Sequence, residues 1–298
     1  MNMTAKTHAS PVRLFAFCAA FFSLTASAAE WPADARIAIT LTFDLDAETV
    51  WWSDVDTMTG NPSSLSHGRY GPDVAVPKIL AVLEKHDVKA TFFIPSWVAE
   101  QYPNAVRSIA RAGHEIGAHG VKHVSPVQLT PEQEAATFAE SIRVLDRVAG
   151  KRPVGYRAPS WAFSNVTLTL AARSGFLYSS NLMDADEPYI HEYPSDLVEL
   201  PVSWVLDDAP YFWFDEDSWN KTIHSAASVK AIWQEEFEAA YNDNGYLNLT
   251  MHPQIIGRPA RLHMLDDFIG WMKSHENVWI TTGTALAVYV RGQQGRSP

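Results

Sequence analysis

Short apolar runs alternate with helical patterns along most of the chain. A β-branched run at 36–43 (RIAITLTF) ends at acidic residues, as a buried strand does where it enters a loop. The spacing of Ile79, Leu80 and Leu83 predicts a helix over 77–86, with proline in its first turn. We expect further strands at 90–94, 115–119, 176–180, 197–202, 246–251 and 278–281, and helices at 104–112, 130–150, 164–174, 227–242 and 259–275.

This order of elements predicts one α/β domain. About seven or eight β–α alternations follow one another without a linker, an internal repeat or a low-complexity tract. A parallel sheet is the natural packing for that order, and the length favours a closed barrel over an open doubly wound sheet. Because chemistry in such barrels lies where strands end and loops begin, polar residues directly after apolar strands are the candidates for a site.

The first apolar run differs from the others and has the pattern of an export signal. Lys6 and Arg13 precede the run at 14–24 (LFAFCAAFFSL), and residues 26–28 (ASA) give the small-x-small pattern of a signal peptidase site. A run of about eleven residues is too short for a membrane span, which needs roughly 20. We therefore predict a signal peptide over 1–28, a single domain over 29–298 and an exported, periplasmic protein; the alternative is a buried N-terminal helix.

Composition narrows the class of protein and the kind of metal site. The 298 residues include 34 Asp and Glu against 23 Lys and Arg, an acidic balance that argues against a nucleic-acid partner. The only cysteine, Cys18, lies in the predicted signal peptide, so the mature chain can form neither a disulfide nor a cysteine-based zinc site. Any metal must then be held by His, Asp or Glu.

Two strand ends carry residue types that bind metal. In TFDLD, Asp44 and Asp46 are spaced i, i+2 and can point to the same side of an extended chain, where their charges repel unless a cation lies between them. In HGVKH, His119 and His123 are spaced i, i+4 and can converge on one metal. Alone, these patterns also suit an acidic turn and two surface histidines. Together they favour a two-histidine, one-carboxylate site with open positions for water and substrate.

Two further strand ends carry a cation and an imidazole. Arg157 in GYRAPSW could pair with a carboxylate and orient it, with Trp161 as a wall; the alternative is a surface turn ending in a core tryptophan. His252 in LTMHP is a candidate general acid, because the pKa of histidine can be tuned near neutrality. A lone histidine at a strand end can equally be structural.

Other conspicuous residues are assigned to packing or to solvent. Asp207 and Asp208 fit a solvated acidic turn better than a substrate contact. The aromatic stretch at 211–213 fits barrel packing, and His114 is expected to be structural. Trp51 suits core or lid packing as well as it suits stacking on a sugar.

The order TFDLD, HGVKH, RAPSW and LTMHP resembles the polysaccharide deacetylases, the NodB-homology group also called carbohydrate esterase family 4. The resemblance extends from about residue 36 to 287. The stretches SHGRYG (66–71) and VELPVSW (198–204) are most similar to its peptidoglycan deacetylase-like branch, which also contains relatives resembling cyclic imide and allantoin hydrolases. The resemblance implies a distorted (β/α) barrel of about seven parallel strands, with 29–298 as the catalytic domain.

The resemblance also implies a role for each motif residue. Asp44 matches the catalytic base, Arg157 the arginine that orients this base, and His252 the general acid. The residues that match the ligands of a divalent metal, with zinc expected, are Asp46, His119 and His123. The residues that match the oxyanion-binding position and the aromatic lining of the groove are Ser160 and Trp161.

Two positions depart from the pattern of this family. Leu45 separates the two aspartates, which are adjacent in many members, although the separated form occurs in the branch named above. Gly120 stands where Ser or Thr often hydrogen-bonds the loop after the first histidine. The loop from 119 to 123 must therefore be braced by other groups.

The implied activity is removal of N-acetyl groups from an amino-sugar polymer by metal-activated water, with an Asp base and a His acid. Peptidoglycan is the first candidate, so the expected partner is an N-acetylated glycan. An alternative is a metal-dependent amidohydrolase of small cyclic imides or ureides, similar to allantoinases; another is a non-catalytic carbohydrate-binding relative. A long open groove would favour the glycan, and a capped pit would favour a small ring.

Overall fold

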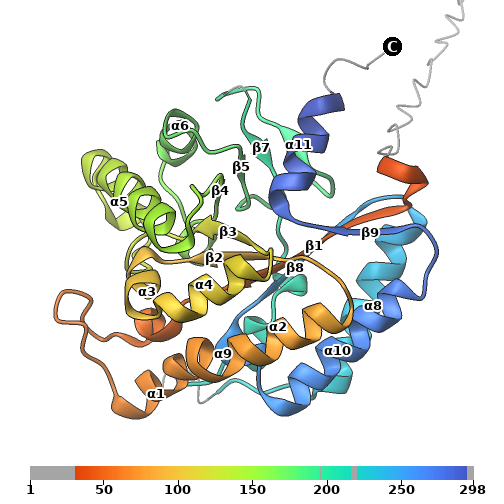
Figure 1. Ribbon diagram of the computed structural model, residues 1–298, viewed down its shortest axis with the longest axis horizontal. Helices are drawn as coiled ribbons and strands as arrows, with labels where there is room; N and C mark the ends of the chain where they lie inside the picture. The colour runs from red at the N-terminus through yellow and green to blue at the C-terminus, as the bar shows by residue number, and fades with distance from the viewer. Residues whose placement is uncertain (1–30, 195, 216–219, 294–298) are drawn as a thin grey trace, which may run out of the picture.

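A curled β-sheet forms the centre of the molecule, with helices on its outer side (Figure 1). The computed structural model describes residues 31–194, 196–215 and 220–293, so the predicted signal peptide at 1–28 lies outside the described residues. None of the helices described there is both long enough and apolar enough to cross a membrane.

The sheet is almost entirely parallel. Its nine strands have the order β6-β7-β5-β4-β3-β2-β1-β8, with β9 paired to β1. The strands are β1 (Ile37–Asp44), β2 (Thr91–Ile94), β3 (Glu115–Ala118), β4 (Gly155–Tyr156), β5 (Tyr178–Ser179), β6 (Tyr189–Ile190), β7 (Val198–Glu199), β8 (Tyr246–Met251) and β9 (Val278–Thr281). Only the β6–β7 pair is antiparallel. The predicted distorted (β/α) barrel is confirmed, with nine strands in the sheet where about seven were expected.

Helices cover the outside of this sheet. In Figure 1, α5 lies beside β3 with α6 next to it, and α8 lies beside β8 with α10 next to it. The α-helices are α1 (Pro62–Tyr70), α2 (Val76–Lys85), α3 (Ser96–Gln101), α4 (Pro103–Arg111), α5 (Pro131–Ala149), α6 (Thr167–Arg173), α7 (Ala209–Phe212), α8 (Ala226–Asn242), α9 (Pro253–Ile256), α10 (Pro259–Lys273) and α11 (Gly283–Gln293). Short 3₁₀ turns and one π-helical turn, η3 (Gly71–Ala75), connect several of them.

Strand β1 pairs with three other strands, β2, β8 and β9, and all eight of its residues are buried. Its last residues pair with β2, its first residues pair with β9, and β8 runs along its other edge. Burial on both faces explains why its sequence is a continuous apolar run rather than an alternating one. The same burial places Asp44, its last residue, at the carboxyl edge of the sheet.

The predicted elements with long apolar or periodic patterns are confirmed. Strands β8 and β9 have the predicted bounds, and a capping box formed by Thr130 and Gln133 begins α5, the helix expected at 130–150. The helix expected at 164–174 begins later, at Thr167, because Val166 is the N-cap residue of α6. Helix α1 and strand β6 were not predicted; α1 has a largely polar sequence, and β6 is only two residues long.

The barrel stays open between β8 and the β6–β7 hairpin. In the described part of the chain no strand ladder joins β8 to these strands. Asn248 spans the opening instead, since its amide Nδ2 donates to Ser180 Oγ at 3.1 Å and to the Pro201 carbonyl at 3.0 Å. Its Oδ1 accepts from the Thr40 hydroxyl at 3.0 Å. A side chain thus replaces backbone pairing on this side.

His114 lies just before β3 and has the structural role that was expected for it. Its Nδ1 accepts a hydrogen bond from the Ala90 N–H at 3.2 Å, so the fold requires that nitrogen to be unprotonated. Burial, with a smaller contribution from the Lys89 charge, lowers the pKa of His114 to about 4.

We expect the substitution His114→Gln to make the fold less sensitive to acid. The folded-state pKa lies below the ordinary value of 6.5, so the unfolded chain binds the proton first. The stability linked to this group is therefore full above that value and is lost as pH falls toward 4. Urea unfolding at neutral and mildly acidic pH should show a smaller loss of unfolding free energy in the variant. His263→Gln, at an exposed position on α10, is the control; equal losses in all three proteins would contradict the prediction.

Candidate metal centre and active site

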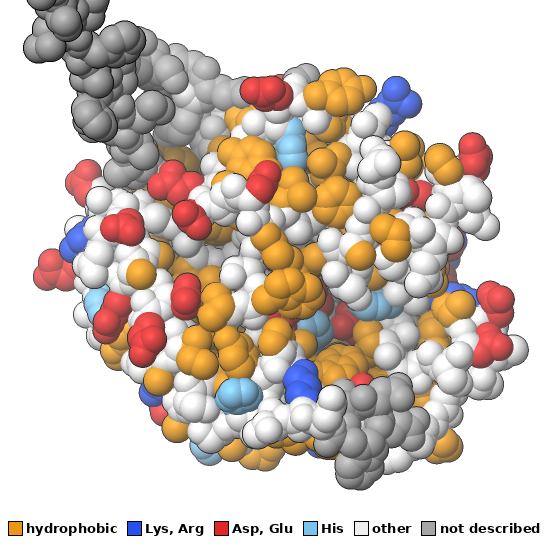
Figure 2. Space-filling view, turned by 180° about the vertical axis from the view of Figure 1, so that it is seen from behind, with side chains coloured by type: hydrophobic (Ala, Val, Ile, Leu, Met, Phe, Trp, Pro, Cys, Tyr) orange, Lys and Arg blue, Asp and Glu red, His pale blue; other side chains and the backbone are white. Residues whose placement is uncertain are grey.

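A cavity of about 420 Å³ opens at the carboxyl end of the sheet, where the four strand-end motifs meet. Figure 2 shows a face of the molecule on which histidine and acidic side chains lie recessed among hydrophobic ones. The residues that line the cavity include Asp44, Asp46, His119, His123, Ser160, Trp161, Trp204, Asp207, Trp213 and His252. Arg157 is fully buried behind this lining. All eight predicted site residues therefore lie together.

Parallel strand ends explain why residues so distant in sequence converge. Asp44 ends β1, and Asp46 is the N-cap residue of the next short turn, η2 (Ala47–Trp51). His119 follows β3 and His252 follows β8 directly. Because the carboxyl ends of parallel strands meet at one edge of a sheet, each side chain is delivered to the same place.

Two groups of side chains in the described residues could hold a metal ion: Asp46, His119 and His123 form the first, and Asp207, Asp208 and His252 form the second. In the first group the two histidines and the carboxylate match the predicted ligands. One ligand atom from each lies within 4.8 Å of the others. Asp46 Oδ1 is 3.5 Å from His119 Nε2 and 3.8 Å from His123 Nε2. This oxygen is buried and has no hydrogen-bond partner in the described residues. An orphaned carboxylate oxygen between two imidazole nitrogens fits the donor set of a catalytic metal site with open positions.

The electrostatics of this group also favour a cation. Burial raises the pKa of Asp46 well above its ordinary value; the His252 charge opposes the shift and the Asp44 charge adds to it. Burial lowers the pKa of His119 and of His123, and the His119 charge lowers that of His123 further. Both imidazoles are therefore in the neutral form, which a metal ligand must have.

His119 is held in the tautomer that ligation requires. Its Nδ1 donates to the Arg157 carbonyl oxygen at 2.8 Å, which leaves the Nε2 lone pair facing the cavity. In many metal sites a hydrogen bond from the ring nitrogen that does not bind the metal fixes the orientation of the histidine ring.

Helix α3 braces the loop from His119 to His123. Such support was expected, because Gly120 has no hydroxyl group that could hydrogen-bond the loop. Gly120 has φ +73°, a left-handed conformation that favours glycine. Its carbonyl accepts from the Ser96 N–H at 3.0 Å, and the Val121 carbonyl accepts from the Trp97 N–H at 3.0 Å. The first amides of α3 thus replace the hydroxyl that is missing at position 120.

Arg157 orients Asp44 from inside the barrel. Its Nη1 donates to Asp44 Oδ1 and to Thr42 Oγ1, both at 2.9 Å, and its Nη2 donates to Ser180 Oγ at 2.9 Å. The guanidinium lies over the Phe93 ring, 4.3 Å from its centroid. Asp44 is therefore held by a charge-assisted hydrogen bond while its other oxygen, Oδ2, lies 3.9 Å from His119 Nε2.

Asp207 and Asp208 are not a solvated acidic turn, and that prediction was wrong. Both are buried beside His252, where Asp208 Oδ1 is 2.7 Å from His252 Nδ1 and also accepts from the His252 N–H at 3.1 Å. Burial by itself would lower the pKa of His252, but the charges of Asp207 and Asp208 outweigh it and raise the pKa well above its ordinary value. The sequence does contain a pattern that could have placed these two residues in the site. As in TFDLD, the two carboxylates directly follow an apolar stretch.

Aromatic side chains form two walls of the cavity. Trp161 is buried and packs against Trp204, with ring centroids 4.4 Å apart, and Trp204 is 51% exposed. Ser160 and Trp161 both have positive φ, 57° and 54°, so this turn is held in the left-handed region beside the metal group. On another side Trp213 lies edge-on to the His252 ring at 6.3 Å, although the sequence had assigned it to packing.

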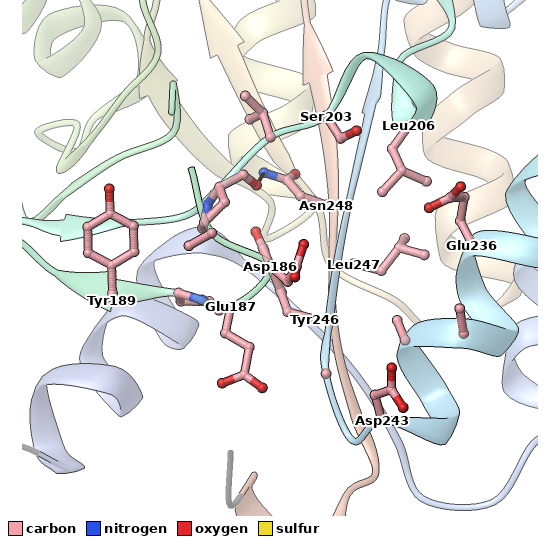
Figure 3. A pocket seen from close by; sticks show the side chains of 17 residues that line it. Asp186, Glu187, Tyr189, Ser203, Leu206, Glu236, Asp243, Tyr246, Leu247 and Asn248 are labelled. Atoms are coloured by element: carbon pink, nitrogen blue, oxygen red, sulfur yellow. Dashed lines mark hydrogen bonds between the residues drawn. The ribbon is translucent and has the colours of Figure 1, made fainter. Parts of the chain in front are cut away.

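A second cavity, of about 820 Å³, lies over the first half of β8 at the opening of the barrel. Figure 3 shows Glu236 on α8 and Asp243, the C-cap residue of that helix, on one side of this cavity, with Asp186 and Glu187 on another. None of the predicted site residues lines it, and its described lining contains no histidine. The residues suited to metal binding and proton transfer are therefore in the smaller cavity.

Comparison with known proteins agrees with this geometry. The family model described as "Polysaccharide deacetylase" matches residues 70–179. The "Peptidoglycan deacetylase" of Helicobacter pylori is 31% identical over 267 residues, which cover 80% of this chain and 91% of that protein. A structure from Mycobacterium smegmatis that carries the polysaccharide deacetylase designation is 40% identical, with a TM-score of 0.85, covering 90% of this chain and 95% of that one. The structure of Puue allantoinase is 25% identical, with a TM-score of 0.78, covering 90% and 94%.

We expect the purified chain to bind one divalent ion, and Asp46→Asn or His119→Ala to weaken binding by more than about 100-fold. Changes to residues that only support metal ligands already cost about 10–100-fold, so loss of a ligand should cost more. Titration calorimetry with Zn²⁺ measures the affinity, and circular dichroism checks that the variants fold. His263→Ala, at an exposed position, should bind as tightly as the wild type. Unchanged affinity in His119→Ala would remove it from the metal site.

Proposed function

This chain belongs to the polysaccharide deacetylase family, whose members hydrolyse N-acetyl amide bonds, and we propose that it deacetylates amino sugars of a glycan, peptidoglycan first. One observation carries this proposal. The orphaned Oδ1 of Asp46 faces two neutral imidazoles, while Oδ2 of the same carboxylate lies 3.7 Å from His252 Nε2. The candidate metal ligands and the candidate proton donor His252 therefore lie on either side of the Asp46 carboxylate.

The metal would be held by Asp46, His119 and His123, and zinc is our proposal for its identity. Two imidazoles, one carboxylate and open positions form the donor set of hydrolytic zinc sites. When bound, such an ion supplies Lewis acidity for the acetamide carbonyl and for a water molecule. The arrangement of the three ligands follows from the hydrogen bonds and the burial described above.

Asp44 is the proposed base. Arg157 donates to its Oδ1 at 2.9 Å, which stabilises the ionised carboxylate and fixes its direction. The second oxygen remains directed at the metal group and can take a proton from the attacking water. Ser160, whose turn borders the cavity, is the proposed site of the backbone N–H that stabilises the oxyanion, and Trp161 is the proposed wall of the sugar site.

His252 is the proposed acid for the departing nitrogen. Asp208 holds Nδ1, so a protonated ring presents its Nε2 proton to the cavity. The raised pKa keeps the ring protonated at neutral pH, which a proton donor requires. We propose that Asp208 acts as a positioning residue for this acid.

Two observations bear on the substrate. The relative from Helicobacter pylori, named a peptidoglycan deacetylase, shares most of its length with this chain, and a wall glycan agrees with the predicted export signal. The similarity to an allantoinase structure favours a second candidate, hydrolysis of a small cyclic imide or ureide by the same residues. Because all eight predicted positions are filled and lie together, a non-catalytic carbohydrate-binding role is the least supported.

Acetate release from purified peptidoglycan and from chitin oligomers, beside ring opening of cyclic imides, tests the choice of substrate. We expect acetate release that a chelator abolishes and that added Zn²⁺ restores, because the metal group lies at the centre of the site. Ring opening without acetate release would favour the second candidate. Absence of any chelator-sensitive hydrolysis would favour the binding role.

For His252→Ala we expect retained metal binding and a kcat reduced about 10²–10⁴-fold, the usual contribution of a general acid. Asp208→Asn should also lower kcat, because a neutral amide oxygen can still accept from Nδ1 but does not stabilise the positive charge of the protonated ring. Steady-state kinetics and Zn²⁺ titration on the same preparations separate the two effects. Unchanged turnover in His252→Ala would remove this residue from the mechanism.

A further inference from the structure

A groove of about 460 Å³ lies beside the catalytic cavity, on the far side of Trp213. Its lining includes Trp51, Asn61, Ser63, Ser66, His67 and Arg258. These residues come from the segment 51–67 and from the start of α10, and so lie outside the stretch at 70–179 that the family model matches. The groove is therefore built by parts of this chain that the family match does not describe.

An aromatic wall, formed by Trp51 and Trp213, separates the groove from the cavity. The two rings stack with centroids 4.6 Å apart and an interplanar angle of 14°. His67 stacks on Trp51 from the groove side at 4.8 Å, and Trp213 lies beside His252 on the cavity side. Because Trp51 lines the groove and Trp213 lines the cavity, the two spaces adjoin through this one wall. A ligand longer than one sugar could cross it.

Arg258 is the cationic side chain among the described residues of the groove lining. Its guanidinium lies over the Tyr70 ring at 3.7 Å and makes no ion pair with any residue in the described ranges. The lining also contains a carboxylate, Asp215, whose Oδ2 accepts from Trp213 Nε1 at 2.6 Å. Burial, followed by the Arg258 charge, lowers the pKa of His67, so the imidazole there is neutral. The described lining of the groove thus presents one guanidinium, from Arg258, and one carboxylate, which Trp213 already engages, among hydroxyl and amide groups.

We propose that this groove binds the glycan unit next to the one that is deacetylated, and that Arg258 recognises a carboxylate substituent on that unit. Hydroxyl, amide and imidazole groups match a polyhydroxylated sugar, and a guanidinium is the side chain best suited to a carboxylate. The inference rests on the proposed function, because the same glycan would extend from the cavity across the aromatic wall.

The test compares two forms of one glycan strand. In the first, alternate sugars carry a free carboxylate; in the second, these carboxylates have been reduced to alcohols. For the wild type we expect kcat/KM to be higher on the carboxylate strand, and we expect added salt to reduce this preference. Arg258→Gln should lower the ratio of the two kcat/KM values about tenfold, the size of one charge-assisted hydrogen bond.

Lys78→Gln is the matched control. Lys78 is exposed and also approaches the Tyr70 ring, at 5.6 Å, but it does not line the groove. Its substitution should leave the preference as in the wild type. The same loss in both variants would mean that packing on Tyr70, rather than carboxylate recognition, determines the preference, and the proposal would be wrong. Equal kcat/KM for the two strands in the wild type would also overturn it.

Equilibrium binding separates this proposal from the deacetylase proposal. Titration calorimetry with both strands measures their affinities for wild type and Arg258→Gln without relying on turnover. If the wild type hydrolyses neither strand, the proposed function fails, and the binding comparison alone decides the role of the groove. Tighter binding of the carboxylate strand that is lost in Arg258→Gln supports the groove; similar affinities in both proteins, or no binding, reject it.

Discussion

The buried ion pair between Arg157 and Asp44 is the interaction on which the rest of the site depends. A fully buried guanidinium is costly unless it is paired and hydrogen-bonded, and here Asp44, Thr42 and Ser180 supply its partners. The backbone carbonyl of the same residue fixes the ring of His119. One residue therefore sets the direction of the proposed base and the tautomer of a proposed metal ligand, and it joins strands β1, β4 and β5 behind them.

Around this pair, the cavity has more negative than positive groups. Four carboxylates, Asp44, Asp46, Asp207 and Asp208, are buried there, with Arg157 and His252 as the cationic partners. Burial, opposed by His252 and reinforced by Asp208, raises the pKa of Asp207 to about 7, and burial likewise raises the pKa of Asp46 and Asp208. A divalent cation between Asp46 and the two histidines would relieve this repulsion. The chain as a whole has more acidic than basic residues, and the same excess of carboxylates occurs in the cavity, where it favours binding of a cation.

The sequence predicted which residues converge on the cavity better than it predicted the residues that support them. Long buried runs such as 246–251 place the polar residue that follows them, so His252 could be located without knowing its neighbours. Its partner Asp208 lies 44 positions away, on a loop whose position depends on tertiary packing, and was misassigned to solvent. The opening beside β8 and the groove at Arg258 were also missed. Both are formed by segments that are distant in sequence, so no pattern within a single stretch of the sequence predicts them.

The place of β1 in the sheet has a consequence for how the chain is made. This strand lies near the start of the described residues, yet its edges are completed by residues 246–251 and 278–281. During synthesis from the N-terminus, its apolar residues remain without these partners until almost the whole chain has emerged. Contacts between residues so far apart in sequence form slowly. Until they form, an apolar strand that is prone to aggregation stays exposed. The pairing of β1 is therefore completed only when the last strand of the chain is available.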